Sequence, residues 1–251
     1  MSSVLEQQAS ECFDLNASSP EPASKRARIE VDSFNKLDLS QFTLKDNGRS
    51  KNGGINVYPL IAGDVVRFNL TPDDWLQTPF GFNLDGAYEN PSFLGGKAPE
   101  KVGTPEGLSL KVNLAAPQAE FVKKLDDTAR TSFAKFADAK WNPLVVENDK
   151  YSNFLCKFNV IFSGDGLTKI IIVDDRKILR GEGWEFLKEH GFTNGTNAFK
   201  RADVKLSAKI KKLWHVAGKA GLTLEATQLV LRIATKPTEE DVFGDDEKLL
   251  R

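Results

Sequence analysis

The most regular feature of the chain is an alternation of apolar and polar residues, which is typical of half-buried β-strands. It extends over 108–114, 154–162 and 204–210, with an apolar residue at every second position. It returns over 222–233, where the phase slips near Thr227, as it does at a β-bulge. The pattern predicts a mainly β protein.

Glycine-containing turns separate some of these apolar segments. The apolar residues between 57 and 70 are interrupted at Gly63, which predicts a pair of strands. The segment 154–162 is followed by a turn at Gly164 and then by the isoleucine-rich segment 169–173. This order predicts a β-hairpin, with Phe154, Phe158 and Phe162 buried inside the domain.

A change to spacings of three and four residues begins at Pro117 and predicts one long helix. The apolar residues that share one face of this helix are Phe121, Leu125, Ala129, Phe133 and Phe136. A short helix or turn is indicated around Trp184. Strand pairs at short spacing, without regular alternation of strands and helices, favour a β-barrel over a parallel α/β sheet.

Composition divides the chain into three parts. Residues 1–50 are rich in polar residues and lack an apolar period, so we expect a disordered tail. Residues 51–236 form the predicted domain, and residues 237–251 form a short acidic C-terminal tail. Within the domain, 71–106 reads as a long loop. It carries aromatic residues that either stack on a ligand or anchor the loop, namely Trp75, Phe80 and Phe82.

Composition also excludes several classes of protein. No apolar run is long enough to span a membrane, and the N-terminus has no signal-peptide core, so we expect synthesis in the cytosol without secretion. The 251 residues include two cysteines and two histidines, which argues against a disulfide and a zinc site. Phosphate-binding glycine loops are absent from the sequence. We therefore expect a non-enzymatic protein with no cofactor and no metal.

The strongest chemical signal is a local excess of positive charge, although the net charge of the chain is −1. Residues 200–219 hold seven lysines and arginines and one acid, Asp203. The alternation predicts that Lys205, Ser207, Lys209 and Lys211 point away from the core, next to Lys212, Trp214 and His215. Cations of this kind bind phosphates, and an aromatic ring can stack on an unpaired base. The alternative is a solvated strand face whose lysines discourage pairing between sheet edges.

Two further charged segments flank the predicted domain. The acidic tail contains Glu239, Glu240, Asp241, Phe243, Asp245, Asp246 and Glu247. Such a segment can compete with nucleic acid for a basic groove, bind partner proteins, or simply aid solubility. Near the N-terminus, Lys25, Arg26 and Arg28 form a basic cluster, which is either a nuclear-import signal or a group of solvated charges.

The order of the predicted elements resembles a known family. The segments that carry the resemblance are Gly107–Leu114 followed by the long helix, the phenylalanine-rich strand ending in Ile171-Ile172-Val173-Asp174, and the final strands Val204–Trp214 and Gly221–Leu231. Together they resemble the single-stranded-DNA-binding protein of the T-odd phages and its relatives in large DNA viruses of eukaryotes. The resemblance covers about residues 107–235 and the acidic end.

This resemblance implies an OB-fold-like barrel with an inserted helix and non-sequence-specific binding of single-stranded DNA in replication, recombination or repair. Its groove would include Lys111, Lys157, Lys205, Lys209, Lys211, Lys212 and Trp214, with the acidic tail contacting replication proteins. The chain departs from the family in the basic N-terminal cluster, in the loop 71–106 and in its last residues, Lys248-Leu249-Leu250-Arg251. The basic cluster predicts that the protein is located in a nucleus or at a viral replication site.

Two other functions remain open. The chain could be a structural or virion-associated interaction protein without nucleic-acid binding, in which case the lysines are merely solvated. It could also bind RNA in the same groove. The sequence does not decide between DNA and RNA, and it leaves open whether the protein forms a homodimer.

Overall fold

The structure is a computed structural model that describes residues 28–49, 55–71, 74–83, 105–132, 138–148, 153–164, 166–174, 177–191 and 199–233. Its elements are β1 (Arg28–Val31), β2 (Phe42–Arg49), β3 (Ile55–Ile61), β4 (Val65–Asn69), β5 (Leu76–Thr78), β6 (Phe82–Asn83), β7 (Gly107–Leu114), α2 (Ala116–Thr131), β8 (Lys140–Trp141), β9 (Val145–Asn148), β10 (Asn153–Ile161), β11 (Lys169–Asp174), β12 (Lys177–Glu182), α3 (Gly183–Gly191), β13 (Ala202–Val216) and β14 (Lys219–Arg232). Two 3₁₀ turns, Phe34–Lys36 and Leu39–Gln41, lie between β1 and β2.

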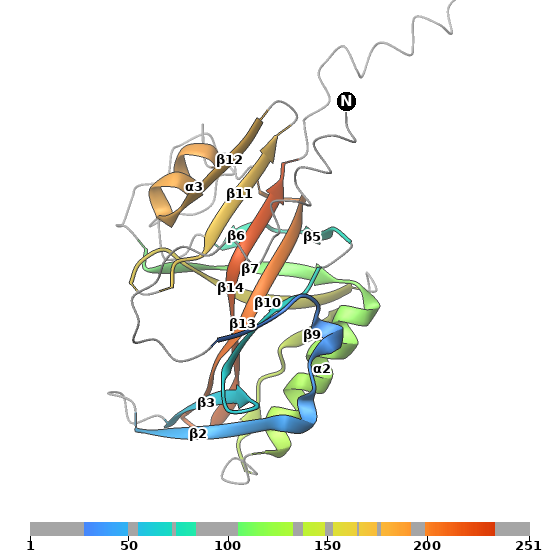
Figure 1. Cartoon of the computed structure of the whole chain (residues 1–251), viewed down its shortest axis with the longest axis vertical. Coiled ribbons are helices and arrows are strands. Elements are labelled where there is room, and N and C mark those ends of the chain that lie inside the picture. Colours follow the sequence, from blue (N-terminus) through green and yellow to red (C-terminus); the bar gives the residue numbers. More distant parts are fainter. Residues whose placement is uncertain are drawn as a thin grey trace, which may run out of the picture.

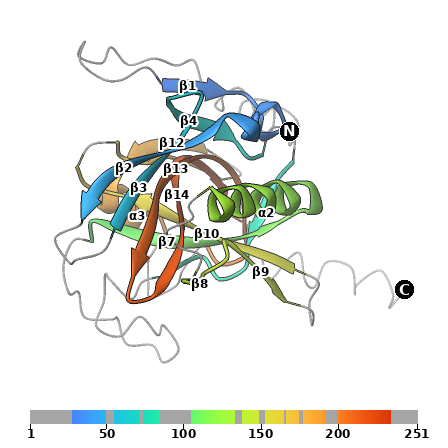
Figure 2. The ribbon, with the colours of Figure 1, turned by 90° about the horizontal axis from the view of Figure 1, so that it is seen from below.

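Five strands close into a ring in the order β13, β5, β7, β10, β14 and back to β13. The strands β13 and β14 are the longest, and they cross the molecule from end to end (Figure 1). Seen from below, α2 lies beside the ring, against β7, β9, β10 and β14 (Figure 2). The chain is therefore mainly β, an OB-like barrel with one long helix, as the sequence predicted.

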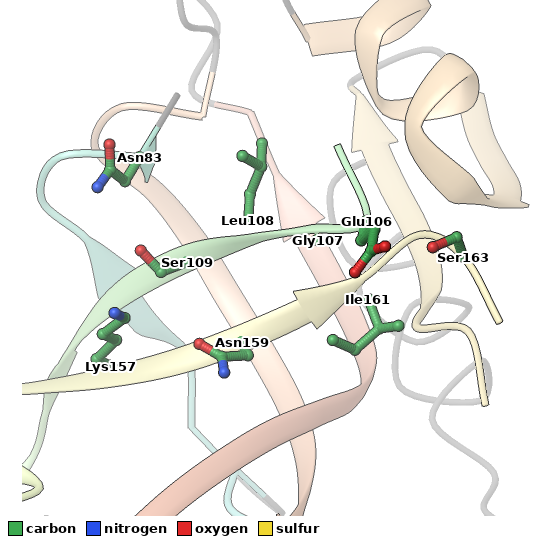
Figure 3. A pocket seen from close by; sticks show the side chains of 9 residues that line it. All are labelled: Asn83, Glu106, Gly107, Leu108, Ser109, Lys157, Asn159, Ile161 and Ser163. Atoms are coloured by element: carbon green, nitrogen blue, oxygen red, sulfur yellow. The ribbon is translucent and has the colours of Figure 1, made fainter. Parts of the chain in front are cut away.

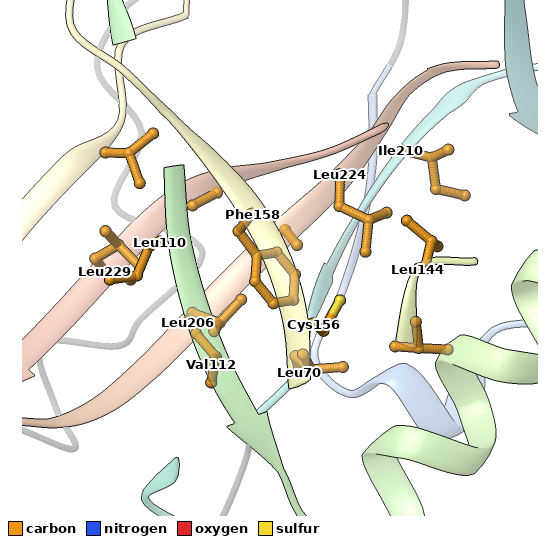
Figure 4. Close-up of a cluster of buried hydrophobic side chains, with 14 of the residues drawn as sticks. Leu70, Leu110, Val112, Leu144, Cys156, Phe158, Leu206, Ile210, Leu224 and Leu229 are labelled. Atoms are coloured by element: carbon orange, nitrogen blue, oxygen red, sulfur yellow. The ribbon is translucent and has the colours of Figure 1, made fainter. Parts of the chain in front are cut away.

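The apolar members of the alternating strands fill the ring. In β7 the buried residues are Leu108, Leu110, Val112 and Leu114, each at most 5% exposed. They meet Cys156 and Phe158 of β10 and the leucines of β13 and β14 (Figure 4). Phe158 is fully buried, Phe162 is buried and Phe154 is half-buried, so the prediction for these rings is confirmed for two of the three.

The β13–β14 hairpin confirms the last predicted strand pair. Ser207 pairs with Gln228 and Ala208 with Ala226, so Thr227 is the extra residue of a bulge, where the sequence pattern slips. A second irregularity occurs at Lys211. Ile210 pairs with Leu224 and Lys212 pairs with Thr223, so Lys211 is an extra residue on β13.

The long helix is also confirmed, with a small change in its buried face. Pro117 lies in the first turn, and the buried side chains include Ala119, Val122, Leu125 and Ala129. Phe121 is half-buried between the rings of Phe34 and Phe68, at centre-to-centre distances of 5.2 and 5.5 Å. Phe133 and Phe136 lie outside the described residues.

The hairpin predicted between residues 154 and 173 is wrong. β10 and β11 do not pair with each other, because both run parallel to β14, β10 beside 224–226 and β11 beside 228–232. The intervening loop is closed by Thr168, whose backbone N donates to the carbonyl of Ile161 at 3.0 Å. The Thr168 hydroxyl also accepts from the backbone N of Ile161 and donates to the carbonyl of Ala226. The chain thus leaves the sheet and rejoins it in the same direction.

The paired strands around Gly63 are confirmed in part. Ala62 and Gly63 have positive φ angles of 51° and 86°, as a tight hairpin turn requires. Among the described residues, a single bridge, between Ile61 at the end of β3 and Asp64 just before β4, joins the two strands. Beyond it the two strands separate, and each pairs with a different part of β13.

The predicted disordered tail is wrong for residues 28–49. These residues form β1, β2 and the two 3₁₀ turns, and Phe34, Leu39 and Phe42 are buried in the main core. Their apolar residues recur at uneven intervals of two and three residues, which fit neither one strand nor one helix, and Phe34, Leu39 and Phe42 pack over the barrel. The domain therefore begins before the predicted boundary at residue 51. Residues 1–27 and 234–251 lie outside the described residues.

Candidate nucleic-acid interface

Two exposed lysines face each other on the outside of the barrel. Lys111 on β7 and Lys157 on β10 are direct cross-strand partners, and both side chains are exposed. The neighbouring pair, Leu110 and Phe158, points into the core. The Nζ of Lys111 lies 5.9 Å from the centre of the Phe80 ring, and Phe80 is 57% exposed. The structure thus combines two cations and one solvent-exposed ring in one place.

A second group of lysines is arranged around a buried carboxylate. Glu225 on β14 is only 5% exposed, and its two oxygens lie 2.9 Å from the Nζ of Lys209 and 3.1 Å from the Nζ of Lys211. Burial lowers the pKa of Lys209, and the hydrogen bond to Glu225 opposes this effect. The side chain of Lys209 is 15% exposed and that of Lys211 is 40% exposed. Lys211 is therefore the more accessible of the two charges.

Lys205 does not lie on a solvated face, which corrects the prediction. It is 6% exposed, and its Nζ lies 5.4 Å from the centre of the Trp75 ring. The guanidinium of Arg232 lies 4.4 Å from the same ring. Trp75 packs against a second apolar cluster, made of Ile171, Val173 and Val230 with Ile178 beside them. Ser207 is fully buried as well. The pattern gave the direction of these side chains correctly but not the residues that cover them.

The remaining predicted groove residues lie toward the far end of the β13–β14 hairpin. Lys212 is half-buried and pairs with Thr223. Trp214 pairs with Gly221, and a Cβ added at Gly221 would lie 3.1 Å from the Cζ2 atom of Trp214. Trp214 and His215 are half-buried. The Trp214 ring therefore lies against the glycine and leaves part of its surface accessible.

A row of polar side chains connects the two lysine groups. Lys209 pairs with Glu225, Glu225 with Asn159, and Asn159 with Ser109. These residues belong to four adjacent strands, which are spaced about 4.8 Å apart, so the row is about 14 Å long. The lysines of β13 and those of β7 and β10 thus share one outer face of the barrel.

A pocket of about 470 Å³ opens at one end of this row. Figure 3 shows the residues that line it: Asn83, Glu106, Gly107, Leu108, Ser109, Lys157, Asn159, Ile161 and Ser163. They come from β6, β7, β10 and the residues next to these strands. The pocket carries both charges, with Lys157 and Glu106 toward opposite ends (Figure 3).

Sequence reasoning missed several residues of this face. Glu225, Asn159 and Ser109 stand at polar positions of alternating strands, and nothing in their own spacing distinguishes them from ordinary solvated positions. Arg67 on β4 is the cross-strand partner of Lys209 on β13. The guanidinium of Arg67 lies 3.0 Å from the carboxylate of Glu30. The register of strands that are distant in sequence brings these groups together, and periodicity does not predict that register.

Other predicted sites are not tested by the structure. The acidic residues 239–247, together with Lys25 and Arg26, lie outside the described residues, and nothing is described of the Arg28 side chain. Within the described ranges, no cluster of three or more His, Cys, Asp or Glu side chains could hold a metal ion. No helix among these residues is both long and apolar enough to cross a membrane.

Comparison with solved structures gives distant likenesses. No family model and no curated protein sequence matches the chain. Among solved structures, the chain is similar to gp2.5, a single-stranded DNA binding protein encoded by bacteriophage T7, with 10% identity, a TM-score of 0.40 and coverage of 72% of this chain and 94% of that one. It is also similar to the single-stranded DNA-binding protein from bacteriophage Enc34 in complex with ssDNA, with 10% identity, a TM-score of 0.36 and coverage of 78% and 98%.

Proposed function

We propose that the chain binds single-stranded DNA on the outer face of the barrel with little dependence on sequence, and that it acts by binding rather than by catalysis. The observation that carries this proposal is the exposed pair of Lys111 and Lys157 beside the exposed ring of Phe80. Like charges directly opposite each other destabilise a strand pair. A phosphate backbone would offset this cost, because it neutralises both ammonium groups and releases counterions.

Aromatic exposure favours a single strand over a duplex. Phe80 is 57% exposed beside Lys111, and Trp214 is half-buried two residues after Lys212, so each offers ring surface near a lysine. Stacking of an unpaired base on such a ring contributes roughly 1–3 kcal/mol. The bases of a duplex are stacked on one another and would gain little. The choice of DNA over RNA rests on the sequence resemblance, since both backbones suit the same lysines.

The wider role that we propose is in replication, recombination or repair, in the nucleus or at a viral replication site. The acidic tail, residues 237–251, would compete with DNA for the lysines and contact replication proteins when it is displaced. Removal of residues 237–251 should therefore tighten DNA binding.

The test is fluorescence anisotropy of a labelled oligo-dT, titrated with protein at several salt concentrations and competed with duplex DNA and with oligo-rU. We expect salt-sensitive binding that duplex DNA competes for poorly. The double variant Lys111→Ala/Lys157→Ala should bind roughly tenfold more weakly at physiological salt, with a salt dependence of log K that is shallower by about 1.4, because it loses two phosphate contacts. A triple change of Lys209, Lys211 and Lys212 is a poorer test, because it leaves Glu225 buried without its partners.

The matched control is Lys124→Ala/Lys177→Ala, which removes two exposed lysines from α2 and β12. It changes the net charge by the same amount and should leave the salt dependence nearly unchanged. Equal effects of the two double variants would show that only net charge matters and would remove the site from β7 and β10. Absence of binding, even without residues 237–251, would refute the proposed function and favour a structural protein. Tighter binding of oligo-rU would refute the preference for DNA.

A further inference from the structure

The pocket between β6, β7 and β10 has a floor made by a glycine and an isoleucine. Gly107 pairs with Ile161 across β7 and β10, and both line the pocket. A Cβ at residue 107 would lie 2.6 Å from the carbonyl oxygen of Val160, so a larger residue would strain the pairing of β7 with β10. The floor is therefore the backbone of Gly107 together with the half-buried side chain of Ile161. A flat ring can lie against such a surface.

Uncharged polar groups lie beside this floor. Ser109 pairs with Asn159 on one side and with Asn83 on the other, so the three side chains form one short row on adjacent strands. Figure 3 shows Ser109 and Asn159 between Lys157 and Glu106. Amides and hydroxyls both donate and accept hydrogen bonds, as recognition of a base edge requires.

The two charges at opposite ends of the pocket would orient a bound nucleotide. Lys157 attracts a phosphate, whereas the exposed carboxylate of Glu106 repels one. A bound nucleotide would thus keep its phosphate near Lys157 and Lys111 and direct its base toward Glu106. The backbone carbonyl of Glu106 accepts from the backbone N of Phe162 at 2.8 Å, which fixes this end of the pocket to the end of β10.

The carboxylate distinguishes between bases because it only accepts hydrogen bonds. Cytosine, adenine and guanine carry an exocyclic amino group that donates, whereas thymine carries a carbonyl oxygen at the corresponding position. The remaining donor of thymine, N3–H, lies between two carbonyl oxygens, which repel a carboxylate. A carboxylate next to the base edge therefore favours the bases with an amino group. Between the pyrimidines, which are similar in size, it favours cytosine.

We propose that this pocket holds one base of the bound strand and prefers cytosine to thymine through the carboxylate of Glu106. The inference rests on the proposed function and adds a base preference to it. The protein would still bind any single strand through its lysines, and the pocket would bias which nucleotide occupies one position.

The test compares two oligonucleotides of about 16 nucleotides, the upper end of the site sizes of such barrels. One is oligo-dT and the other alternates dC and dT, which avoids runs of cytosine. Anisotropy at slightly alkaline pH should show roughly threefold to tenfold tighter binding of the alternating strand, which is the net range for an ordinary hydrogen bond, because the exposure of Glu106 reduces the larger contribution of a charged acceptor. Glu106→Gln should abolish this ratio, because an amide presents a donor as well as an acceptor. Glu120→Gln, on the exposed side of α2, is the control and should keep it.

Three outcomes are decisive. A ratio that disappears in Glu106→Gln and persists in Glu120→Gln supports the pocket as a base site. Equal, tight binding of both strands by the unaltered protein overturns the base preference and leaves the proposed function intact. Failure to bind either strand refutes the proposed function, and the base preference with it.

Discussion

Replacement of Glu225 by glutamine is the sharpest test of how the β13 lysines are held. Glu225→Gln keeps the shape of the side chain and removes the charge that faces Lys209 and Lys211. Removing one partner of a fully buried ion pair costs about 3–5 kcal/mol of folding free energy. Lys211 is 40% exposed and can turn to water, whereas Lys209 is 15% exposed and cannot do so easily. The amide oxygen also keeps one acceptor. We therefore expect a loss below that range, about 2 kcal/mol.

The loss should depend on pH in a direction that the structure sets. The pKa of Lys209 is already lowered by burial from 10.5, and Glu225 is the group that raises it. In the variant the pKa falls further, so between the folded and unfolded pKa values the unfolded state binds more protons and stability rises with pH. The destabilisation should thus be largest near neutral pH and decrease toward about pH 10.

Urea unfolding followed by tryptophan fluorescence, near neutral pH and at about pH 9.5, measures both effects. The matched control is Glu147→Gln, which makes the same change in the surface ion pair with Lys123, where Glu147 is 53% exposed. It should change the free energy of unfolding by less than about 0.5 kcal/mol at both pH values. A Glu225→Gln protein as stable as the control, or one whose destabilisation grows with pH, would refute the assigned roles of burial and charge.

Three further predictions concern the packing of the barrel. Gly107→Ala places a methyl group 2.6 Å from the carbonyl oxygen of Val160. It should lower the free energy of unfolding by about 1–3 kcal/mol in urea titrations, and an unchanged value would show that β7 separates from β10 without cost. Phe158→Ala removes a fully buried ring and should cost about 3–5 kcal/mol in the same measurement, a prediction that a loss under 1 kcal/mol contradicts. Burial raises the pKa of the Cys156 thiol, so in a Cys12→Ser protein a thiol reagent should label Cys156 only as fast as the protein opens, and rapid labelling of the native state would show that the core is accessible.

The sequence predicted which residues face the core better than it predicted which strands meet. Alternation identified β7, β10, β13 and β14, and the slip at Thr227 identified the bulge, because both patterns are local. The hairpin expected after Phe162 failed because a glycine turn suits a chain reversal and a looped excursion equally well. The difference depends on Thr168, whose hydroxyl bonds to β14, nearly sixty residues further along the chain.

The candidate site was predictable in the same partial way. The alternating lysines were correctly assigned to the face away from the barrel interior, but Lys205 is covered by Trp75, a residue from a segment that reads as loop. Glu225 stands at a polar position of an alternating strand, where the pattern predicts a solvated side chain, yet it is buried and binds two of the predicted cations. Periodicity gives the direction of a side chain, whereas its exposure and charge partners depend on strands that are distant in sequence.

The closed ring of strands has a consequence for how the protein reaches its native state. Thr78 on β5 pairs with Ala202 on β13, and the Thr78 hydroxyl donates to the carbonyl of Ala202, 124 residues away. The β13–β14 hairpin can form from local contacts, but the ring closes only when this distant pair meets. Non-local pairings of this kind slow folding, so we expect early appearance of the hairpin and late, slow closure at β5. Until closure, β13 has an unpaired edge there, which makes the intermediate prone to aggregation during refolding.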